Sequence, residues 1–231
     1  MANGSRQATG LLLSVASMLV PGIGRVHAQT APFAKAWQDA NETALGEPGP
    51  LWVALGDSMS QGVGAKDITG GWVGQLHAQL AAAGTPLRLV NFSRTGARVR
   101  DVLDEQLPRL LALPDQPVLV TILVGANDML FRKRRAAAVP DFARLLSRLP
   151  ATGCVMATLP RGNQHALAIN GLIERAAAAD RLRIAEMRGR SWGSLVGTLA
   201  DDHFHPNERG YAAIAAAFAA AIGQAPASRG E

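Results

Sequence analysis

Five short apolar segments, separated by stretches of helix length, place the strongest constraint on how this chain folds. The apolar segments are Leu51–Leu55, Leu87–Phe92, Val118–Val124, Cys154–Thr158 and Leu182–Met187. They show no regular alternation with polar residues, which is typical of strands buried on both faces of a parallel sheet. Because parallel strands are joined by right-handed crossovers, the pattern predicts an α/β fold with a central parallel sheet and helices on both faces.

Helices are predicted between these segments and before the first one. The expected helices are Phe33–Leu45, Trp72–Ala83, Val99–Leu113, Asp141–Leu149, His165–Ala179 and Asn207–Ile222. Pro108 should bend the third of them, because proline removes a hydrogen bond from a helix interior. Pro206 or Asn207 provides the start signal of the last helix.

The length of 231 residues, 48% of them hydrophobic, suits one domain with a substantial core. We expect this domain at residues 51–223, preceded by a helix and turn over residues 31–50 and followed by a frayed tail at 224–231. The net charge of +5 comes mostly from arginines distributed along the chain and does not indicate a nucleic-acid partner. The single cysteine, Cys154, cannot form an internal disulfide.

Residues 1–30 differ in character from the rest and form a leader. Arg6 precedes an apolar run over residues 10–20, which is followed by the expected helix breakers Pro21, Gly22 and Gly24. A run of this length fits the apolar region of a secretory signal peptide and is too short for a membrane-spanning helix. Two interpretations stay open: a signal peptide over residues 1–28 of an exported protein, or an amphipathic leader on a cytoplasmic protein.

The first predicted strand runs directly into Gly56–Gly62, which contains Ser58. A serine at this position lies at the carboxyl end of its strand, where ligands bind in open α/β folds. The segment lacks the Gly-Lys-Ser/Thr ending of a phosphate-binding loop and the third glycine of a dinucleotide loop. Taken alone, it is equally well explained as a Gly/Ser turn.

Three further polar motifs follow later strands or precede the last helix. Gly96 follows the second strand and could offer its backbone N–H to an anion. Asn127, in the segment Gly125–Asp128 after the third strand, carries a neutral amide suited to a developing oxyanion. Asp202 and His205 lie in one loop and could supply the base, and the partner that orients it, which a serine nucleophile requires. All four motifs are expected at the same edge of the sheet.

Together these motifs make the chain resemble the SGNH hydrolase family, also called GDSL-type esterases and lipases. Gly56-Asp57-Ser58 matches the nucleophile block of the family, with Met59 where the family name has leucine. Gly96 and the segment Gly125–Asp128 match the second and third blocks, and the segment Asp202–Pro206 matches the Asp-x-x-His-Pro block. The resemblance covers residues 51–222. It implies the SGNH hydrolase fold, a three-layer, flavodoxin-like α/β/α arrangement with five parallel strands.

The resemblance also implies roles for individual residues. Ser58 would be the nucleophile, His205 the general base and Asp202 the residue that orients the base. The backbone N–H groups of Ser58 and Gly96 and the side-chain amide of Asn127 would form the oxyanion hole. The implied reaction is the hydrolysis of a small-molecule carboxylic ester, with no cofactor and no metal. Asp57 is expected to have a structural hydrogen-bonding role.

Other interpretations of the same residues stay open. Residues 189–193 match the Gly-x-Ser-x-Gly elbow of α/β-hydrolases through Ser191, although no further strands follow it. The cluster at Asp201–His205 could instead hold a metal ion in a phosphoesterase. An acyltransferase or thioesterase would use the same triad. The basic run Arg132–Arg135 is interpreted as a solvated helix start. The sequence specifies neither the acyl and alcohol parts of the substrate nor the oligomeric state.

Overall fold

The fold is described here from a computed structural model, which places residues 21–151, 153–160, 162–189 and 196–223. The first twenty residues of the expected leader lie outside these ranges. The same is true of the expected tail at 224–231 and of Ser191 in the alternative nucleophile motif.

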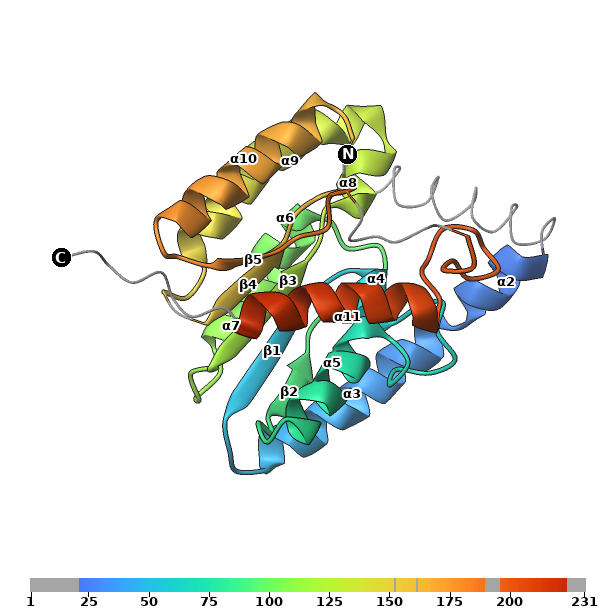
Figure 1. Ribbon diagram of the computed structural model, residues 1–231, viewed down its shortest axis with the longest axis vertical. Helices are drawn as coiled ribbons and strands as arrows, with labels where there is room; N and C mark the ends of the chain where they lie inside the picture. Colours follow the sequence, from blue (N-terminus) through green and yellow to red (C-terminus); the bar gives the residue numbers. More distant parts are fainter. Residues whose placement is uncertain (1–20, 152, 161, 190–195, 224–231) are drawn as a thin grey trace.

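A five-stranded sheet forms the centre of the molecule, and all of its strands run parallel (Figure 1). Its strands, in chain order, are β1 (Leu51–Gly56), β2 (Arg88–Asn91), β3 (Leu119–Leu123), β4 (Cys154–Ala157) and β5 (Arg183–Ala185). Each begins and ends within two residues of its predicted position, which confirms the predicted strands. The order in the sheet is β2-β1-β3-β4-β5, so the strand order switches between β1 and β3. Ligands in open α/β sheets bind at such a switch point.

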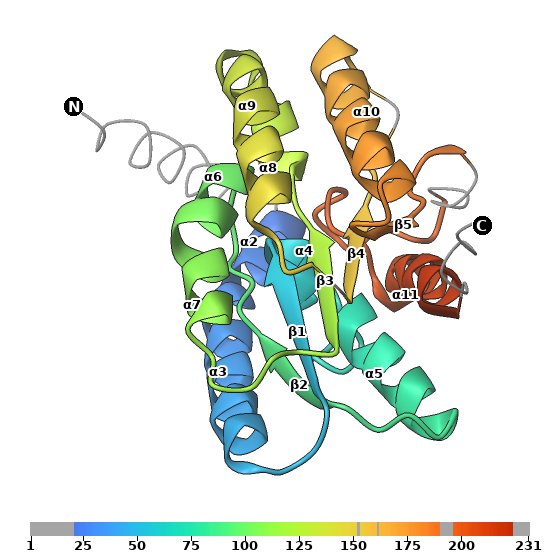
Figure 2. The ribbon, with the colours of Figure 1, turned by 90° about the vertical axis from the view of Figure 1, so that its left-hand side faces the viewer.

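Helices cover both faces of the sheet (Figures 1 and 2). The long helices are α3 (Thr30–Gly46), α5 (Trp72–Ala82), α9 (Arg132–Arg148), α10 (Gln164–Ala178) and α11 (Glu208–Gly223). Helices α5 and α11 pack together on one face, with Trp72 stacked on Phe218 at 4.2 Å between ring centroids. Helices α9 and α10 pack together over the other face, and α3 lies along the edge strand β2. This arrangement confirms the predicted three-layer α/β fold.

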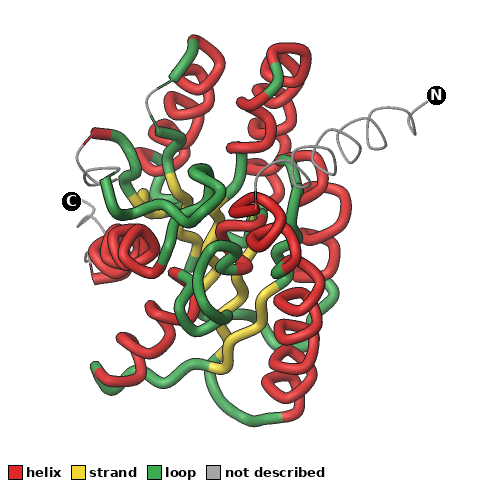
Figure 3. Tube along the Cα trace, turned by 90° about the vertical axis from the view of Figure 1, so that its right-hand side faces the viewer, coloured by secondary structure: helices red, strands yellow, loops and turns green. Residues whose placement is uncertain are grey.

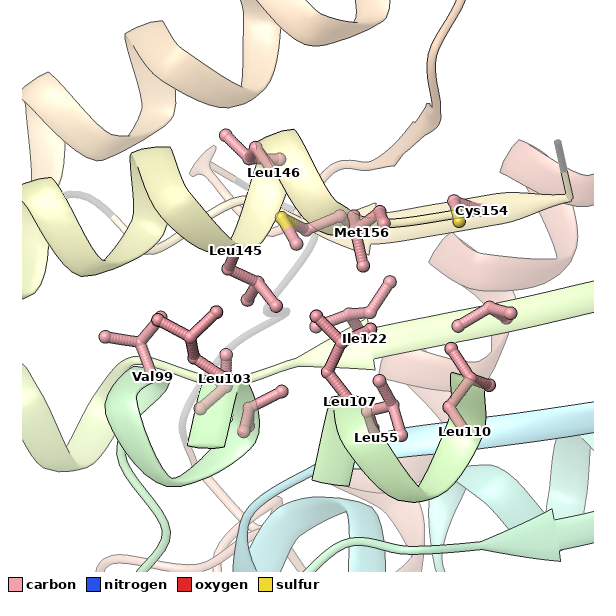
Figure 4. Packing of buried hydrophobic residues seen from close by; sticks show 14 of the residues in the cluster. Leu55, Val99, Leu103, Leu107, Leu110, Ile122, Leu145, Leu146, Cys154 and Met156 are labelled. Atoms are coloured by element: carbon pink, nitrogen blue, oxygen red, sulfur yellow. The ribbon is translucent and has the colours of Figure 1, made fainter. Parts of the chain in front are cut away.

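The core between the sheet and the helices of the second face consists of aliphatic side chains (Figure 4). Leu55 and Ile122 project from neighbouring strands and are fully buried. Leu107 and Leu145 meet them from the helical layer and are also fully buried. These contacts explain why the strands are apolar along their whole length, since both faces of the sheet are covered.

Two expectations about helices were wrong. The chain forms α2 (Pro21–Ala28) where Pro21 and two glycines were expected to prevent a helix. Proline is tolerated in the first turn of a helix, and packing of Val26 in a buried cluster offsets the low helix propensity of glycine. Helix α9 begins at Arg132 rather than at Asp141, because the helix continues through Pro140. Arg132 and Lys133 are exposed at the start of this helix, as a solvated helix start predicts. Arg134 and Arg135 are half-buried: Arg134 lies over the Phe131 ring, and Arg135 donates to the carbonyl of Met129 at 2.8 Å.

The helix predicted at Val99–Leu113 forms as three consecutive pieces. These are α6 (Val99–Asp101), the π-helical η1 (Val102–Gln106) and α7 (Leu107–Leu111). The irregular stretch lies immediately before Pro108, which has no N–H to continue the regular ladder. Leu107 instead donates its N–H to the carbonyl of Val102, one residue further back than in an α-helix. The predicted helix is thus irregular next to Pro108, and the bend expected there stays a prediction.

Two short helices sit at the carboxyl ends of β1 and β3: α4 (Ser58–Gln61) and α8 (Ala126–Leu130). Neither was predicted, because both are too short to produce an apolar period. Within the described ranges, no helix combines the length and hydropathy that crossing a membrane requires.

Candidate active site

Ser58 is the first residue of α4, directly beyond the end of β1. Asp57 caps this helix, because its Oδ1 atom accepts a hydrogen bond from the Met59 N–H at 3.0 Å. A capping carboxylate holds the first turn of a short helix that would otherwise be unstable. Asp57 therefore has the expected structural hydrogen-bonding role, and it holds Ser58 at the strand end.

His205 reaches Ser58 across 147 positions of the sequence. Its Nε2 atom lies 2.9 Å from Ser58 Oγ, and its Nδ1 atom lies 2.6 Å from Asp202 Oδ2. Since a carboxylate only accepts, the Nδ1–H donates to Asp202 and leaves Nε2 free to accept from the serine hydroxyl. The structure thus brings together all three residues that the sequence predicted.

The loop around Asp202 favours the charged carboxylate. Burial raises the pKa of Asp202, but hydrogen bonds from the ring and backbone N–H of His205 and from the backbone N–H of Phe204 outweigh burial and lower it. Phe204 also packs its ring edge-on against the His205 imidazole at 4.9 Å. Asp202 is therefore ionised at neutral pH and opposes reorientation of the imidazole.

The candidate oxyanion residues Gly96 and Asn127 lie beyond the ends of β2 and β3, the two strands that neighbour β1. Gly96 lies in an exposed turn with a φ of +75°, a conformation that glycine adopts without strain. The backbone N–H groups of Ser58 and Gly96 have no acceptor among the described residues. Asn127 donates one amide hydrogen to the carbonyl of Ala97 at 3.0 Å, which joins it to the Gly96 turn and leaves its second amide hydrogen available.

Further side chains that were not predicted from the sequence hold the Gly96 turn. Gln61, on α4, accepts hydrogen bonds from the N–H and hydroxyl of Thr95 through one amide oxygen, at 2.8 and 2.6 Å. Asp128, beside Asn127, accepts from the N–H of Val99 at 3.0 Å, and burial raises its pKa to about 6. Both residues lie inside the motifs already noted, but nothing in their spacing reveals which backbone groups they bind.

Side-chain amides also clamp strand ends to helices. Gln106, in η1, accepts from the Gly56 N–H and donates to the Gly56 carbonyl, both at 2.8 Å. Among the described residues, Asn41 with Asn91 and Asn170 with Leu159 form similar pairs. Each amide imitates the hydrogen bonds of one more strand residue. The clamp on Gly56 holds the strand end that leads into Ser58.

Asp57 is the most deeply buried carboxyl group near the site, with 1% of its surface exposed. Its Oδ2 atom has no hydrogen-bond partner among the described residues. Burial raises its pKa to about 7, although the Met59 N–H and the charge of His205 act in the opposite direction. A buried carboxyl with a free oxygen is more stable when protonated.

The arrangement of the described residues gives little support to the two alternative sites, a metal site at Asp201–His205 and the Ser191 motif. Within the described ranges, no group of three or more His, Cys, Asp or Glu side chains is arranged to hold a metal ion. His203 is exposed, has a positive φ of 54°, and belongs to no group of described side chains that could bind a metal ion. Ser191 lies outside the described residues, and no described strand follows β5, so the strand arrangement of α/β-hydrolases does not fit.

The fold and this constellation define a class: a parallel α/β protein with a serine, a histidine and a carboxylate hydrogen-bonded in series at the carboxyl edge of the sheet. Residues 54–213 match the model of the GDSL-like lipase/acylhydrolase family. The chain therefore belongs to this family and is an ester-hydrolysing enzyme. No curated protein matches the sequence.

Solved structures of similar fold include esterases and lipases. TesA shares 26% identity at a TM-score of 0.63, with 75% of this chain and 98% of TesA covered. The lipase Lip_vut3 from a goat rumen metagenome shares 19% identity at a TM-score of 0.60, with 75% and 97% covered. A carbohydrate esterase of family 3 from Talaromyces cellulolyticus shares 17% identity at a TM-score of 0.58, with 74% and 96% covered. The last two similarities establish the fold alone.

Proposed function

We propose that this protein is a serine esterase that hydrolyses carboxylic esters through Ser58, His205 and Asp202, and that residues 51–223 form its hydrolase domain. The observation that carries the proposal is the unbroken hydrogen-bonded series from Asp202 Oδ2 to His205 at 2.6 Å and from His205 to Ser58 Oγ at 2.9 Å. Serine is a poor nucleophile at neutral pH, and this arrangement supplies the base and its orienting partner.

In the first half of the reaction, His205 Nε2 takes the hydroxyl proton as Ser58 Oγ attacks the ester carbonyl carbon. The carbonyl oxygen becomes an oxyanion that accepts from the N–H groups of Ser58 and Gly96 and from the Asn127 amide. Donors already in place cost no reorganisation at the moment of reaction. His205 then gives its proton to the leaving alcohol, and the acyl group stays on Ser58 as an ester.

In the second half, a water molecule gives its proton to His205 and attacks the acyl carbon. The same oxyanion donors stabilise the second tetrahedral intermediate. The bond to Ser58 Oγ breaks, and His205 returns the proton to the serine. Transfer of the acyl group to another alcohol, or hydrolysis of a thioester, would use the same groups. The triad therefore specifies neither the acyl acceptor nor the leaving group.

The test is hydrolysis of a series of p-nitrophenyl esters of increasing acyl length by wild type and by Ser58→Ala. We expect Ser58→Ala to lower kcat by about 10⁶-fold, because the remaining groups cannot form the acyl-enzyme. The acyl length at which kcat/KM peaks then defines the acyl preference. Added alcohols, followed by product analysis, separate transfer from hydrolysis.

Two controls sharpen this experiment. Ser191→Ala removes the serine of the alternative motif and should retain wild-type activity. A chelator such as EDTA should leave the wild-type rate unchanged. Retention of activity by Ser58→Ala would refute the serine mechanism, and loss of activity with chelator would favour the metal-dependent alternative.

A further inference from the structure

The N-terminal helices α2 and α3 precede residue 54, where the family match begins. Figure 1 shows α2 beside the loop that leads into α11, and Figure 3 shows the loops gathered around it at this end of the sheet. That loop carries Asp202 and His205. The extension therefore contacts the part of the molecule in which the proposed base lies.

Helix α2 packs closely on the residue next to Asp202. A Cβ atom at Gly22 would lie 2.3 Å from the carbonyl oxygen of Asp201, so only glycine permits this approach. Arg25 forms an ion pair with the Asp201 carboxylate at 2.7 Å, although exposed pairs of this kind contribute little. Val26 is buried with Val63, and Ala200 packs against this cluster. The apolar contact and the close backbone approach hold α2 against the loop.

Gln29, directly after α2, makes the most specific contact of the extension. Its Oε1 atom accepts from the Gly64 N–H at 2.9 Å, and its Nε2 atom donates to the Ala65 carbonyl at 3.0 Å. A side-chain amide that satisfies two neighbouring backbone groups fixes both their position and their orientation. Gln29 therefore determines where the backbone of Gly64 and Ala65 lies.

The Gly64 backbone is the surface against which His205 rests. Gly64 has a φ of +104°, and a Cβ atom there would lie 2.9 Å from His205 Cβ and 2.4 Å from the Pro206 carbonyl oxygen. The same loop is tied to the nucleophile, because the Val63 N–H donates to the Ser58 carbonyl at 3.1 Å. A displacement of this loop would thus change the relative positions of His205 and Ser58.

From these contacts we infer that Gln29, supported by α2, is a positioning residue that holds His205 in register with Ser58 through the loop Gly62–Ala65. The inference rests on the proposed function, since it assigns Gln29 a role through His205. Gln29 touches neither the nucleophile nor the substrate in this role. Misplacement of a catalytic group by about 1 Å can cost up to ~10²-fold in rate, so a clamp at this position acts mainly on kcat.

The test compares Gln29→Ala with Gln38→Ala in the full-length chain. Gln38 is an exposed glutamine on α3 whose side chain donates to Glu42, its one hydrogen-bond partner among the described residues, so it serves as a matched control. We expect Gln29→Ala to lower kcat by at least about 10-fold with KM within two-fold of wild type. It should also slow the labelling of Ser58 by a fluorophosphonate by a similar factor, since that reaction displaces fluoride with the same serine and base. Gln38→Ala should change neither quantity.

A merely structural role predicts a different result. In that case Gln29→Ala would lower the melting temperature, by about 5 °C for two lost hydrogen bonds, while kcat per labelled active site stays at the wild-type value. That outcome, or a rise in KM at unchanged kcat, would overturn the inference. If Gln29→Ala does not fold, Gln29→Glu is judged by the same criteria, because it keeps the acceptor for the Gly64 N–H and loses only the donor to Ala65.

Ser58→Ala measured in parallel separates the two proposals. An inactive Ser58→Ala with a fully active Gln29→Ala would overturn only the positioning role. An active Ser58→Ala would overturn the serine mechanism itself, and the positioning role with it.

Discussion

At the scale of single residues, the proposed oxyanion hole consists of hydrogen-bond donors that the fold leaves without an internal acceptor. The N–H groups of Ser58 and Gly96 have no acceptor among the described residues. Asn127 has two amide hydrogens and uses one to fix itself to Ala97. An oxyanion hole requires this combination, because its donors must be held rigidly and yet be free to bind the developing charge.

Replacement of Asn127 tests the proposed oxyanion hole at the level of a single residue. We expect Asn127→Ala to lower kcat by ~10²–10³-fold with little change in KM, because the lost hydrogen bond forms mainly in the transition state. Steady-state kinetics on the preferred p-nitrophenyl ester measures both constants. Asn127→Asp, which replaces the donor by a negative charge, should be at least as slow. A kcat for Asn127→Ala within three-fold of wild type would remove this residue from the mechanism.

At the scale of elements, the strand ends near the site are held by side chains from the helices. The π-helical η1 places Gln106 so that its amide pairs with both backbone groups of Gly56. Pro108 contributes to this geometry by preventing a regular α-helix at this point. The irregular helix is thus connected to the position of the strand that carries Ser58.

Loss of this clamp should destabilise the protein. Gln106→Ala leaves the buried N–H of Gly56 without an acceptor, and we expect it to lower the free energy of unfolding by about 2 kcal/mol. Urea denaturation followed by circular dichroism measures the change. Gln116→Ala, an exposed glutamine in the loop before β3, is the matched control and should leave the stability unchanged. Equal stabilities for the two variants would show that the clamp contributes nothing.

At the scale of the whole molecule, Asp57 makes stability depend on pH. Its pKa is raised by burial to about 7 in the folded protein, against about 4 in an unfolded chain. The folded state therefore binds the proton more tightly. The stability associated with this proton is fully present below pH 4 and is lost as the pH rises through 7.

Asp57→Asn should remove this loss, because the amide keeps an oxygen for the Met59 N–H and never ionises. We expect the stability of Asp57→Asn relative to wild type to increase by about 2–3 kcal/mol between pH 5 and pH 8, as part of a full difference of about 4 kcal/mol that accumulates from below pH 4. Urea unfolding at pH 5, 6.5 and 8 measures the trend. Asp104→Asn, at an exposed position of η1, is the control for loss of a surface charge. A stability difference that does not vary with pH would contradict the shifted pKa.

The sequence by itself determined the sheet and pointed to the residues of the proposed site. Continuous apolar runs are typical of strands buried on both faces, so the strands were predicted within two residues. Ser58, Asp202 and His205 stand in short motifs whose residue types suit the proposed reaction. The tertiary structure decided what depends on distant partners. Burial of Val26 against Val63 allows a helix at Pro21–Ala28, although its glycines cost ~1 kcal/mol each relative to alanine. Likewise, nothing in the sequence distinguishes Gln29 and Gln106 from other polar residues. Only the folded chain brings their amides to particular backbone groups, because three-dimensional proximity, and not local propensity, selects hydrogen-bond partners.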